Sequence, residues 1–167
     1  MRELKVVEIR VSTGDAVPLV VLEEVDGSHR LLPIWMSHGG ASAIFSATED
    51  PDPERPNIHD LAWRLVDSGS DALDAVRIVA YEDGQFFAEL VLGSRCVAAR
   101  PSDAIAFALR AGCPIHCVDE VLDQAGIDPA QGVSPGEPAG ADDEVERFRE
   151  FLDTVNPDDF TGDAGDP

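Results

Sequence analysis

The first third of the chain alternates apolar and polar positions in the way that β-strands do. Residues 4–12 follow a two-residue period, and residues 18–25 and 30–35 read as two further strands. Asp26-Gly27 between those two is a dipeptide favoured in hairpin turns, where positive φ angles are needed. The pattern therefore predicts one strand followed by a β-hairpin.

Helical signals come next. Ser37 can cap a helix through residues 40–46, which the proline-rich stretch 49–56 cannot continue, so that stretch is predicted to be a loop. Asn57 is a good N-cap for a second helix. The apolar stripe of that second helix is predicted to consist of Leu61, Leu65 and Val66.

The pattern then returns to strands. Residues 75–81 and 85–92 flank Glu82-Asp83-Gly84 and predict a second hairpin. The remaining elements are predicted in the order strand 96–99, helix 101–110, strand 114–118 and helix 119–125.

Together these elements predict an α+β fold, with a mixed, mainly antiparallel sheet and several packed helices, in a domain spanning residues 1–127. Residues 128–141, rich in Pro, Gly and Ala, read as a flexible linker. Residues 142–167 read as an acidic tail with an amphipathic helix at 142–154. The apolar stripe of that tail helix is formed by Val145, Phe148, Phe151 and Leu152.

Charge changes the picture most. The chain has 12 Lys and Arg against 33 Asp and Glu, a formal net charge of −21. Residues 1–127 contribute −11 and residues 128–167 contribute −10. A chain this acidic is repelled by nucleic-acid phosphates unless its arginines are gathered locally. Another interpretation of the acidity is adaptation to a salty cytoplasm with activity intact, which predicts that stability or activity rises with salt.

Composition also bears on location. No apolar run reaches the length needed to cross a bilayer, and the N-terminal residues show no signal-peptide pattern. Cys96, Cys113 and Cys117 are odd in number and lack a disulfide spacing, so they are interpreted as buried thiols in a reducing compartment. We expect a cytoplasmic protein without membrane contact.

Several catalytic patterns are absent or incomplete. The sequence has no P-loop and no dinucleotide-binding glycine motif. Ser37-His38-Gly39-Gly40 contains the His-Gly-Gly element of some oxyanion holes, but no G-x-S-x-G elbow accompanies it. A strand at 114–118 would place the metal-binding residue types His116 and Cys117 on opposite faces, which favours buried thiols over a metal site.

Two segments combine polar chemistry with a helix start. In the first, His59 could act as a general base or metal ligand and Asp60 as a metal-ligating carboxylate. The alternative is that Asp60 only complements the helix dipole and His59 is solvated.

In the second segment, Pro101 begins the helix. Arg100 could hold a phosphate with help from backbone N–H groups, with Asp103 beside it. The alternative is that Ser102 and Asp103 merely cap the helix and Arg100 is a surface charge. Spacing alone leaves both segments open.

Residues 1–127 also carry a series of segments found in one order in a known family. These are Leu32-Pro33-Ile34-Trp35, Arg55-Pro56, His59-Asp60-Leu61, Phe86-Phe87-Ala88-Glu89-Leu90, Arg100-Pro101-Ser102-Asp103-Ala104-Ile105-Ala106, Pro114-Ile115 and Glu120-Val121-Leu122. In these segments the chain resembles the bifunctional nuclease family. The resemblance implies an α+β fold, self-association and hydrolysis of both DNA and RNA. It transfers no residue roles.

One departure from the family pattern stands out. Family members usually follow the Leu-Pro-Ile-Trp strand with a Gly and then a Glu-Ala pair, where this chain has Ser37 and then Gly40-Ala41. If the missing Glu binds a metal or acts as a base, its absence weakens catalysis.

The leading hypothesis is a cytoplasmic nuclease acting on DNA and RNA, self-associated as a dimer or a larger oligomer. In it Arg55, Arg100 and Ser102 bind the substrate, while His59, Asp60 and Asp103 are catalytic. Asp60 and Asp103 would bind a divalent cation such as Mg²⁺ or Mn²⁺, and His59 would transfer a proton. The alternative is a catalytically weak or inactive interaction module of the same fold.

Overall fold

The fold is described from a computed structural model. The structure describes residues 1–10, 17–49, 52, 54–69 and 71–131. All of these belong to one compact unit, Met1–Gly136. The start of the predicted linker forms a short 3₁₀ helix, η1 (Pro129–Gln131). The tail helix predicted at 142–154 lies outside the described residues.

Seven strands form one sheet in the order β3-β2-β1-β7-β4-β5-β6. Of the six pairings between neighbouring strands, only that of β4 with β7 is parallel. The mixed, mainly antiparallel α+β fold predicted from the sequence is confirmed. The strands are β1 (Arg2–Arg10), β2 (Leu19–Glu24), β3 (Leu31–Trp35), β4 (Leu73–Glu82), β5 (Gln85–Leu92), β6 (Arg95–Ala99) and β7 (Ile115–Cys117).

Both predicted hairpins are confirmed. β2 pairs with β3, and β4 pairs with β5, each in antiparallel register. The β4–β5 turn has positive φ at Asp83 (49°) and Gly84 (79°), the requirement of a tight two-residue turn. The dipeptide signals in the sequence therefore marked a real backbone constraint.

The short strand β7 joins the two hairpins into one sheet. It pairs with residues 2–4 of β1 on one side and residues 76–78 of β4 on the other. Ile115 and Cys117 are buried, whereas His116 points to the opposite face and is half-buried. The predicted separation of His116 from Cys117 is thus confirmed.

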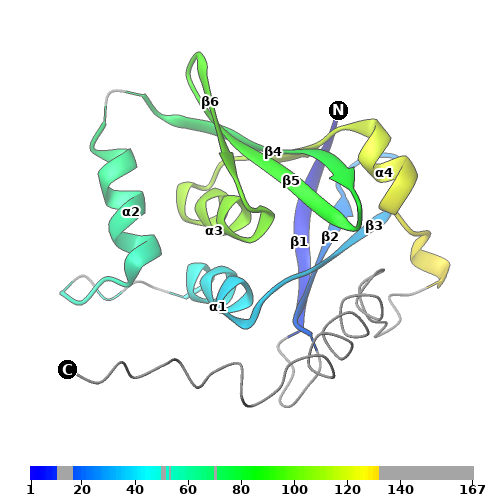
Figure 1. Cartoon of the computed structure of the whole chain (residues 1–167), viewed down its shortest axis with the longest axis horizontal. Coiled ribbons are helices and arrows are strands. Elements are labelled where there is room, and N and C mark those ends of the chain that lie inside the picture. The colour runs from blue at the N-terminus through cyan, green and yellow to red at the C-terminus, as the bar shows by residue number, and fades with distance from the viewer. Residues whose placement is uncertain (11–16, 50–51, 53, 70, 132–167) are drawn as a thin grey trace, which may run out of the picture. The chain divides into compact units, whose positions relative to one another are not determined.

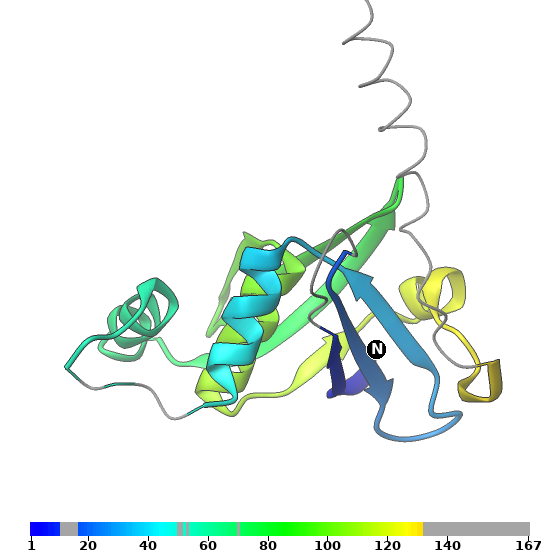
Figure 2. The same ribbon diagram turned by 90° about the horizontal axis from the view of Figure 1, so that it is seen from below.

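The described part of the unit also contains four α-helices: α1 (His38–Ala47), α2 (Ile58–Asp67), α3 (Pro101–Ala111) and α4 (Asp119–Ala125). Helices α1 and α3 lie side by side, against the sheet (Figures 1 and 2). A core of Val, Leu, Ile and Ala side chains from β1, β2, β4, β5 and these two helices fills the space between them.

Two of the three predicted helix caps are confirmed. Ser37 accepts a hydrogen bond from the backbone N–H of Gly40, and Asn57 accepts from His59 and Asp60. The cap predicted at Ser102 is wrong. Arg100 is the N-cap of α3 and makes no side-chain cap, while Ser102 lies inside the first turn and is buried. The reason is Pro101, whose fixed φ suits the first helical position, so that the N-cap lies at Arg100, two residues before Ser102.

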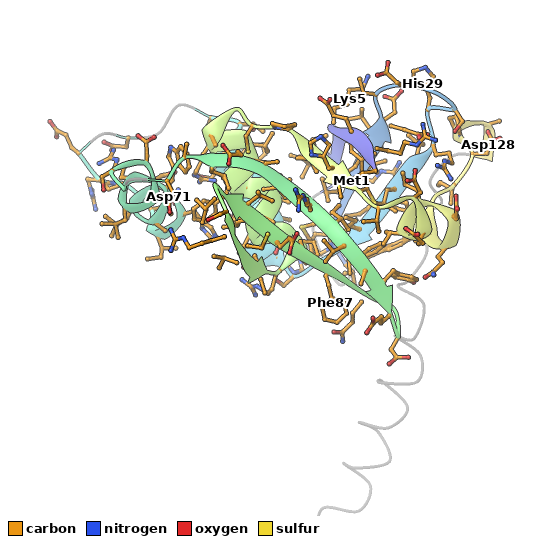
Figure 3. The ribbon with its side chains drawn as sticks, turned by 90° about the horizontal axis from the view of Figure 1, so that it is seen from above. Met1, Lys5, His29, Asp71, Phe87 and Asp128 are labelled. Carbon is orange, nitrogen blue, oxygen red and sulfur yellow. The ribbon has the colours of Figure 1, made fainter. Side chains whose placement is uncertain are left out.

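Helix α2 is attached to the unit differently from α1 and α3. Its only fully buried residue is Asp60, and the predicted stripe residues Leu61 and Leu65 are 45% and 67% exposed. Trp63 packs edge-to-face on Phe107 of α3, with ring centroids 6.3 Å apart. Polar and aromatic contacts with α3 therefore hold α2 in place. Figure 3 shows that α2 and Asp71 lie at one end of the described residues, opposite His29 and Asp128.

The three cysteines differ from one another. Cys117 is buried, Cys113 is half-buried and Cys96 is exposed on the edge strand β6. Burial raises the pKa of the Cys117 thiol to about 12, so this group stays protonated. The prediction of buried thiols is correct for Cys117 and wrong for Cys96, because an edge strand exposes side chains that a central strand would cover.

No helix in the described part of the chain has both the length and the apolar character to cross a membrane.

Candidate functional site

A histidine, an aspartate and an arginine meet where the first turn of α2 faces the first turn of α3. His59 Nε2 lies 3.3 Å from Asp103 Oδ1, although the two residues are 44 positions apart. Arg100 grips the same carboxylate with two hydrogen bonds, Nε to Oδ2 at 2.7 Å and Nη2 to Oδ1 at 3.1 Å. The fold thus assembles three of the residues that the sequence singled out. We call them the His-Asp-Arg cluster.

The cluster is only partly shielded from water. The side chains of His59 and Asp103 are 23% and 25% exposed, and that of Arg100 is 71% exposed. Burial raises the pKa of Asp103, but hydrogen bonds from Arg100 and His59 outweigh it and hold the pKa below its ordinary value. Asp103 is therefore a carboxylate at neutral pH, and Arg100 still presents its other N–H groups to solvent.

A pocket of about 290 Å³ opens beside the cluster. Two helices begin at this pocket, because Ser37 caps α1 and Arg100 caps α3. Helix N-termini carry partial positive charge and free N–H groups, which suits them to anions. The full lining is Ile34, Trp35, Met36, Ser37, Gly84, Gln85, Phe86, Arg100, Pro101 and Ser102. We call this the α1–α3 pocket.

Ser102 of α3 packs directly against Gly40 of α1. A Cβ at Gly40 would lie 2.8 Å from Ser102 Cβ and 2.9 Å from Ser102 Oγ, which is too close for a real side chain. Ser102 is 6% exposed and lines the α1–α3 pocket. Position 40, where the family pattern has a glutamate, therefore has no room for any side chain while Ser102 is in this place.

The contact between Gly40 and Ser102 predicts that alanine has different effects at Gly39 and at Gly40. In Gly40→Ala, overpacking should lower the free energy of unfolding by about 1–3 kcal/mol. The higher helix propensity of Ala offsets up to about 1 kcal/mol of this loss. Gly39→Ala is the matched control, because its Cβ would meet only Ser37 Oγ at 3.9 Å. That control should be neutral or stabilising.

Urea unfolding of the two variants measures the difference. Adding Ser102→Gly to Gly40→Ala should restore part of the lost stability, because it removes the side chain that clashes. Equal stability of the Gly39 and Gly40 variants would contradict the close approach.

Asp60 faces away from the cluster. Its Oδ1 accepts a 2.7 Å hydrogen bond from Arg110 Nε, and its Oδ2 accepts from the backbone N–H of Asn57 in a capping box. The side chains of Arg110 and Asp60 are only 7% and 9% exposed. Asp60 thus forms a buried ion pair that connects α2 to α3. The same carboxylate also accepts the hydrogen bond of a backbone N–H at the start of α2.

The remaining predicted residues have different surroundings. Arg55 is exposed, and its guanidinium has no hydrogen bond or ion pair with the described residues. Both oxygens of Asp60 and both oxygens of Asp103 already accept hydrogen bonds. Among the described residues no group of three or more His, Cys, Asp or Glu side chains is arranged to hold a metal ion.

Sequence reasoning missed two features of this region. Arg110 was overlooked, although an arginine in an otherwise apolar helical run needs a buried carboxylate partner. The other feature is that Trp35 and Phe86, which belong to predicted strands and to the segments that resemble the family, both line the α1–α3 pocket. Local spacing cannot show this, because Trp35 and Phe86 are 51 positions apart in the chain.

Comparison with known proteins identifies the class that this fold and site define. The family profile described as the bifunctional nuclease domain matches residues 20–130. The matched range includes the whole His-Asp-Arg cluster and the α1–α3 pocket. The chain therefore belongs to the bifunctional nuclease domain family.

Individual relatives extend the comparison. The chain is 43% identical over 162 residues to the uncharacterized proteins MT1877 and Rv1829 from two strains of Mycobacterium tuberculosis, covering 96% of this chain and 98% of each relative. It is 31% identical over 106 residues to Bifunctional nuclease 1 of Arabidopsis thaliana, covering 59% of this chain and 33% of that protein. Family membership and the distant plant relative both connect the chain to nucleic acids.

Proposed function

We propose that the protein hydrolyses phosphodiester bonds in DNA and RNA at the His-Asp-Arg cluster. The observation that carries the proposal is the contact of His59 with Asp103, which is itself gripped by Arg100 beside the α1–α3 pocket. A histidine oriented by a carboxylate and placed next to a phosphate-binding arginine is an arrangement suited to general base catalysis.

The chemistry follows from the ring nitrogen that faces Asp103. When His59 Nε2–H donates a hydrogen bond to Asp103 Oδ1, Nδ1 is the unprotonated nitrogen and can take a proton from an attacking water. The phosphate would be held by Arg100 and by N–H groups at the start of α3, where Asp103 itself offers no obstacle because its charge is paired. Arg55 and Ser102 would add contacts to the substrate.

A divalent cation is not required by this scheme. The described donors offer no ready set for Mg²⁺ or Mn²⁺, because the carboxylates of Asp60 and Asp103 are each paired with an arginine. The proposed steps therefore use only protein groups and water, and an assay with EDTA tests whether a metal ion is recruited together with the substrate.

The decisive experiment is an assay of the purified protein on single-stranded DNA, duplex DNA and RNA, with and without EDTA. His59→Ala, purified in parallel, is the essential control because contaminating nucleases give false activity. The variant should lose about 100-fold or more of the activity. Equal activity in both preparations would overturn the site, and inactivity of both would overturn the proposed reaction.

A second candidate function is supported by two observations. Gly40 leaves no room for the glutamate of the family pattern, and the chain carries a net charge of −21. Both fit an interaction module that keeps the fold without efficient catalysis. Inactive protein that still binds a protein partner through its acidic surface would favour this function.

A further inference from the structure

The two edges of the sheet differ in how they are protected from further pairing. The edge strand β3 contains Pro33, which has no backbone N–H. Its first residue, Leu31, also exchanges two backbone hydrogen bonds with Ile127, at 2.9 and 2.8 Å. A proline and a covering segment are two common ways to stop an edge strand from pairing with another chain. The other edge strand, β6, has neither of them within the described residues.

The backbone of β6 presents hydrogen-bonding groups on its outer side. Strands β5 and β6 are joined by a two-residue turn, and the pair Leu92–Arg95 closes this turn. The closing residues bond to each other, and in an antiparallel pair every second residue then directs its N–H and C=O groups to the partner strand. Counted from Arg95, the backbone groups of Cys96 and Ala98 therefore point away from β5. They have no backbone partner among the described residues.

The side chains of β6 leave this edge accessible. Cys96, Val97 and Ala98 are all exposed. None of the five residues of β6 is acidic, and its single charged residue, Arg95, is paired with Asp71 at 2.7 Å. The whole chain has a net charge of −21, so two copies repel each other over most approaches. At β6 a second copy meets no carboxylate of the strand itself.

The sequence of β6 is complementary to itself in one antiparallel register. When two copies pair about Val97, the two Val97 side chains lie opposite each other, which is a favourable pair of β-branched residues. Cys96 of each copy then lies opposite Ala98 of the other, and each of these two pairs exchanges two backbone hydrogen bonds. Arg95 lies opposite Ala99, so no like charges face each other across the interface.

We propose that two copies of the chain associate through β6, antiparallel and centred on Val97, so that their two sheets join into one. Such a contact uses the same strand in both copies and leaves no further β6 edge open. Because Pro33 and Ile127 protect the β3 edges, association stops at the dimer. The interface is independent of the proposed nuclease function, since it contains no residue of the His-Asp-Arg cluster.

An engineered disulfide tests both the surface and the register. In this arrangement the two Val97 Cα atoms are about 4.5 Å apart, a distance that a disulfide can span. Mild oxidation of the full-length variant Cys96→Ala/Val97→Cys should therefore convert most of it into a covalent dimer. The two native Cys96 residues are diagonal neighbours with Cα atoms about 7–8 Å apart, so the unaltered protein should not be linked.

The matched control for the disulfide is Cys96→Ala/Val7→Cys. Val7 has the same exposed fraction as Val97, 44%, but it lies on β1, which is an internal strand of the sheet. This variant should remain monomeric on a non-reducing gel. Equal cross-linking at positions 7 and 97 would show random collision of exposed thiols and would overturn the proposed interface.

Sedimentation equilibrium measures the association without a cross-link. The protein should have twice the 17.9 kDa mass of one chain. Val97→Lys places two like charges opposite each other and should raise the dissociation constant of the dimer about tenfold or more. Ala98→Pro removes an outward N–H without touching a bond to β5 and should have a similar effect. Val7→Lys should leave the dissociation constant unchanged.

The possible outcomes separate the interface from the proposed reaction. A monomer at about 1 mM protein would overturn the dimer. A dimer that survives Val97→Lys, or that is disrupted instead by Leu65→Lys on the exposed face of α2, would mean that another surface is used. These measurements do not involve cleavage, so an inactive protein would leave the interface standing, and a monomeric but active one would leave the proposed function standing.

Discussion

Replacing Asp60 by Ala should release α2 from the rest of the unit. The change leaves Arg110 with an unpaired charge at a site where the arginine side chain is only 7% exposed. Breaking a buried ion pair in this way costs about 3–5 kcal/mol. Because Asp60 is the only fully buried residue of α2, we expect this cost to fall on the attachment of that helix.

Hydrogen exchange of backbone amides measures the loss of local stability in α2 itself. Amides of α2 should exchange about 100-fold faster or more in Asp60→Ala, whereas those of β4 and β5 should change little. Asp123→Ala is the matched control, because Asp123 pairs with Arg30 at 2.8 Å but is 70% exposed, and such pairs contribute about 0–1 kcal/mol. Unchanged exchange in α2 would show that Trp63 and its neighbours hold the helix without the ion pair.

The Asp60–Arg110 ion pair also affects the position of His59 in the His-Asp-Arg cluster. His59 precedes Asp60 and reaches Asp103 only when α2 lies against α3. Loss of Asp60 should therefore reduce any activity that needs His59, even though Asp60 touches no member of the His-Asp-Arg cluster. Loss of activity in an Asp60 variant is thus no evidence that Asp60 binds a metal.

Local signals in the sequence predicted most of the fold. Asp83-Gly84 demanded positive φ, and Ser37 and Asn57 offered side-chain caps, so the second hairpin and two helix starts could be found from a few residues each. The strand β7 was predicted, but its place in the sheet between β1 and β4 was not. Three residues between β1 and β4 are selected by tertiary pairing with both strands, which no local pattern expresses.

The candidate site was predictable in its members but not in its partnerships. His59 and Asp60 are adjacent and read as one motif, yet successive helical positions point about 100° apart. His59 therefore joins Asp103, while Asp60 joins Arg110. The sequence alone could not show that His59 belongs to the cluster whereas Asp60 attaches α2 to α3.

Asp103→Asn is expected to lower activity about as strongly as His59→Ala. The substitution keeps the shape of the side chain but removes the charge that pairs with Arg100 and orients His59. Loss of a group that orients a general base should lower the rate about 100-fold or more. The free energy of unfolding should change by only about 0–1 kcal/mol, because the Arg100 side chain that pairs with Asp103 is 71% exposed. Cleavage rates and urea unfolding of the same preparation separate the two effects.

The control for this variant is Asp71→Asn. Asp71 pairs with Arg95 at the same 2.7 Å distance as the Arg100–Asp103 pair, but it belongs to no part of the cluster. Its replacement should leave cleavage unchanged. A similar loss of activity in both variants would indicate a general electrostatic effect and would contradict a specific role of Asp103.

The pH dependence provides a further check on Asp103. Its pKa lies below the ordinary value of 3.8, so its carboxylate stabilises the folded state above that pH, and the contribution is lost as pH falls through the lower folded value. The small stability difference between the protein and Asp103→Asn should therefore persist from pH 7 to pH 5 and be lost only in stronger acid. A difference that disappeared already near pH 5 would mean that Arg100 and His59 do not hold this carboxylate in its ionised form.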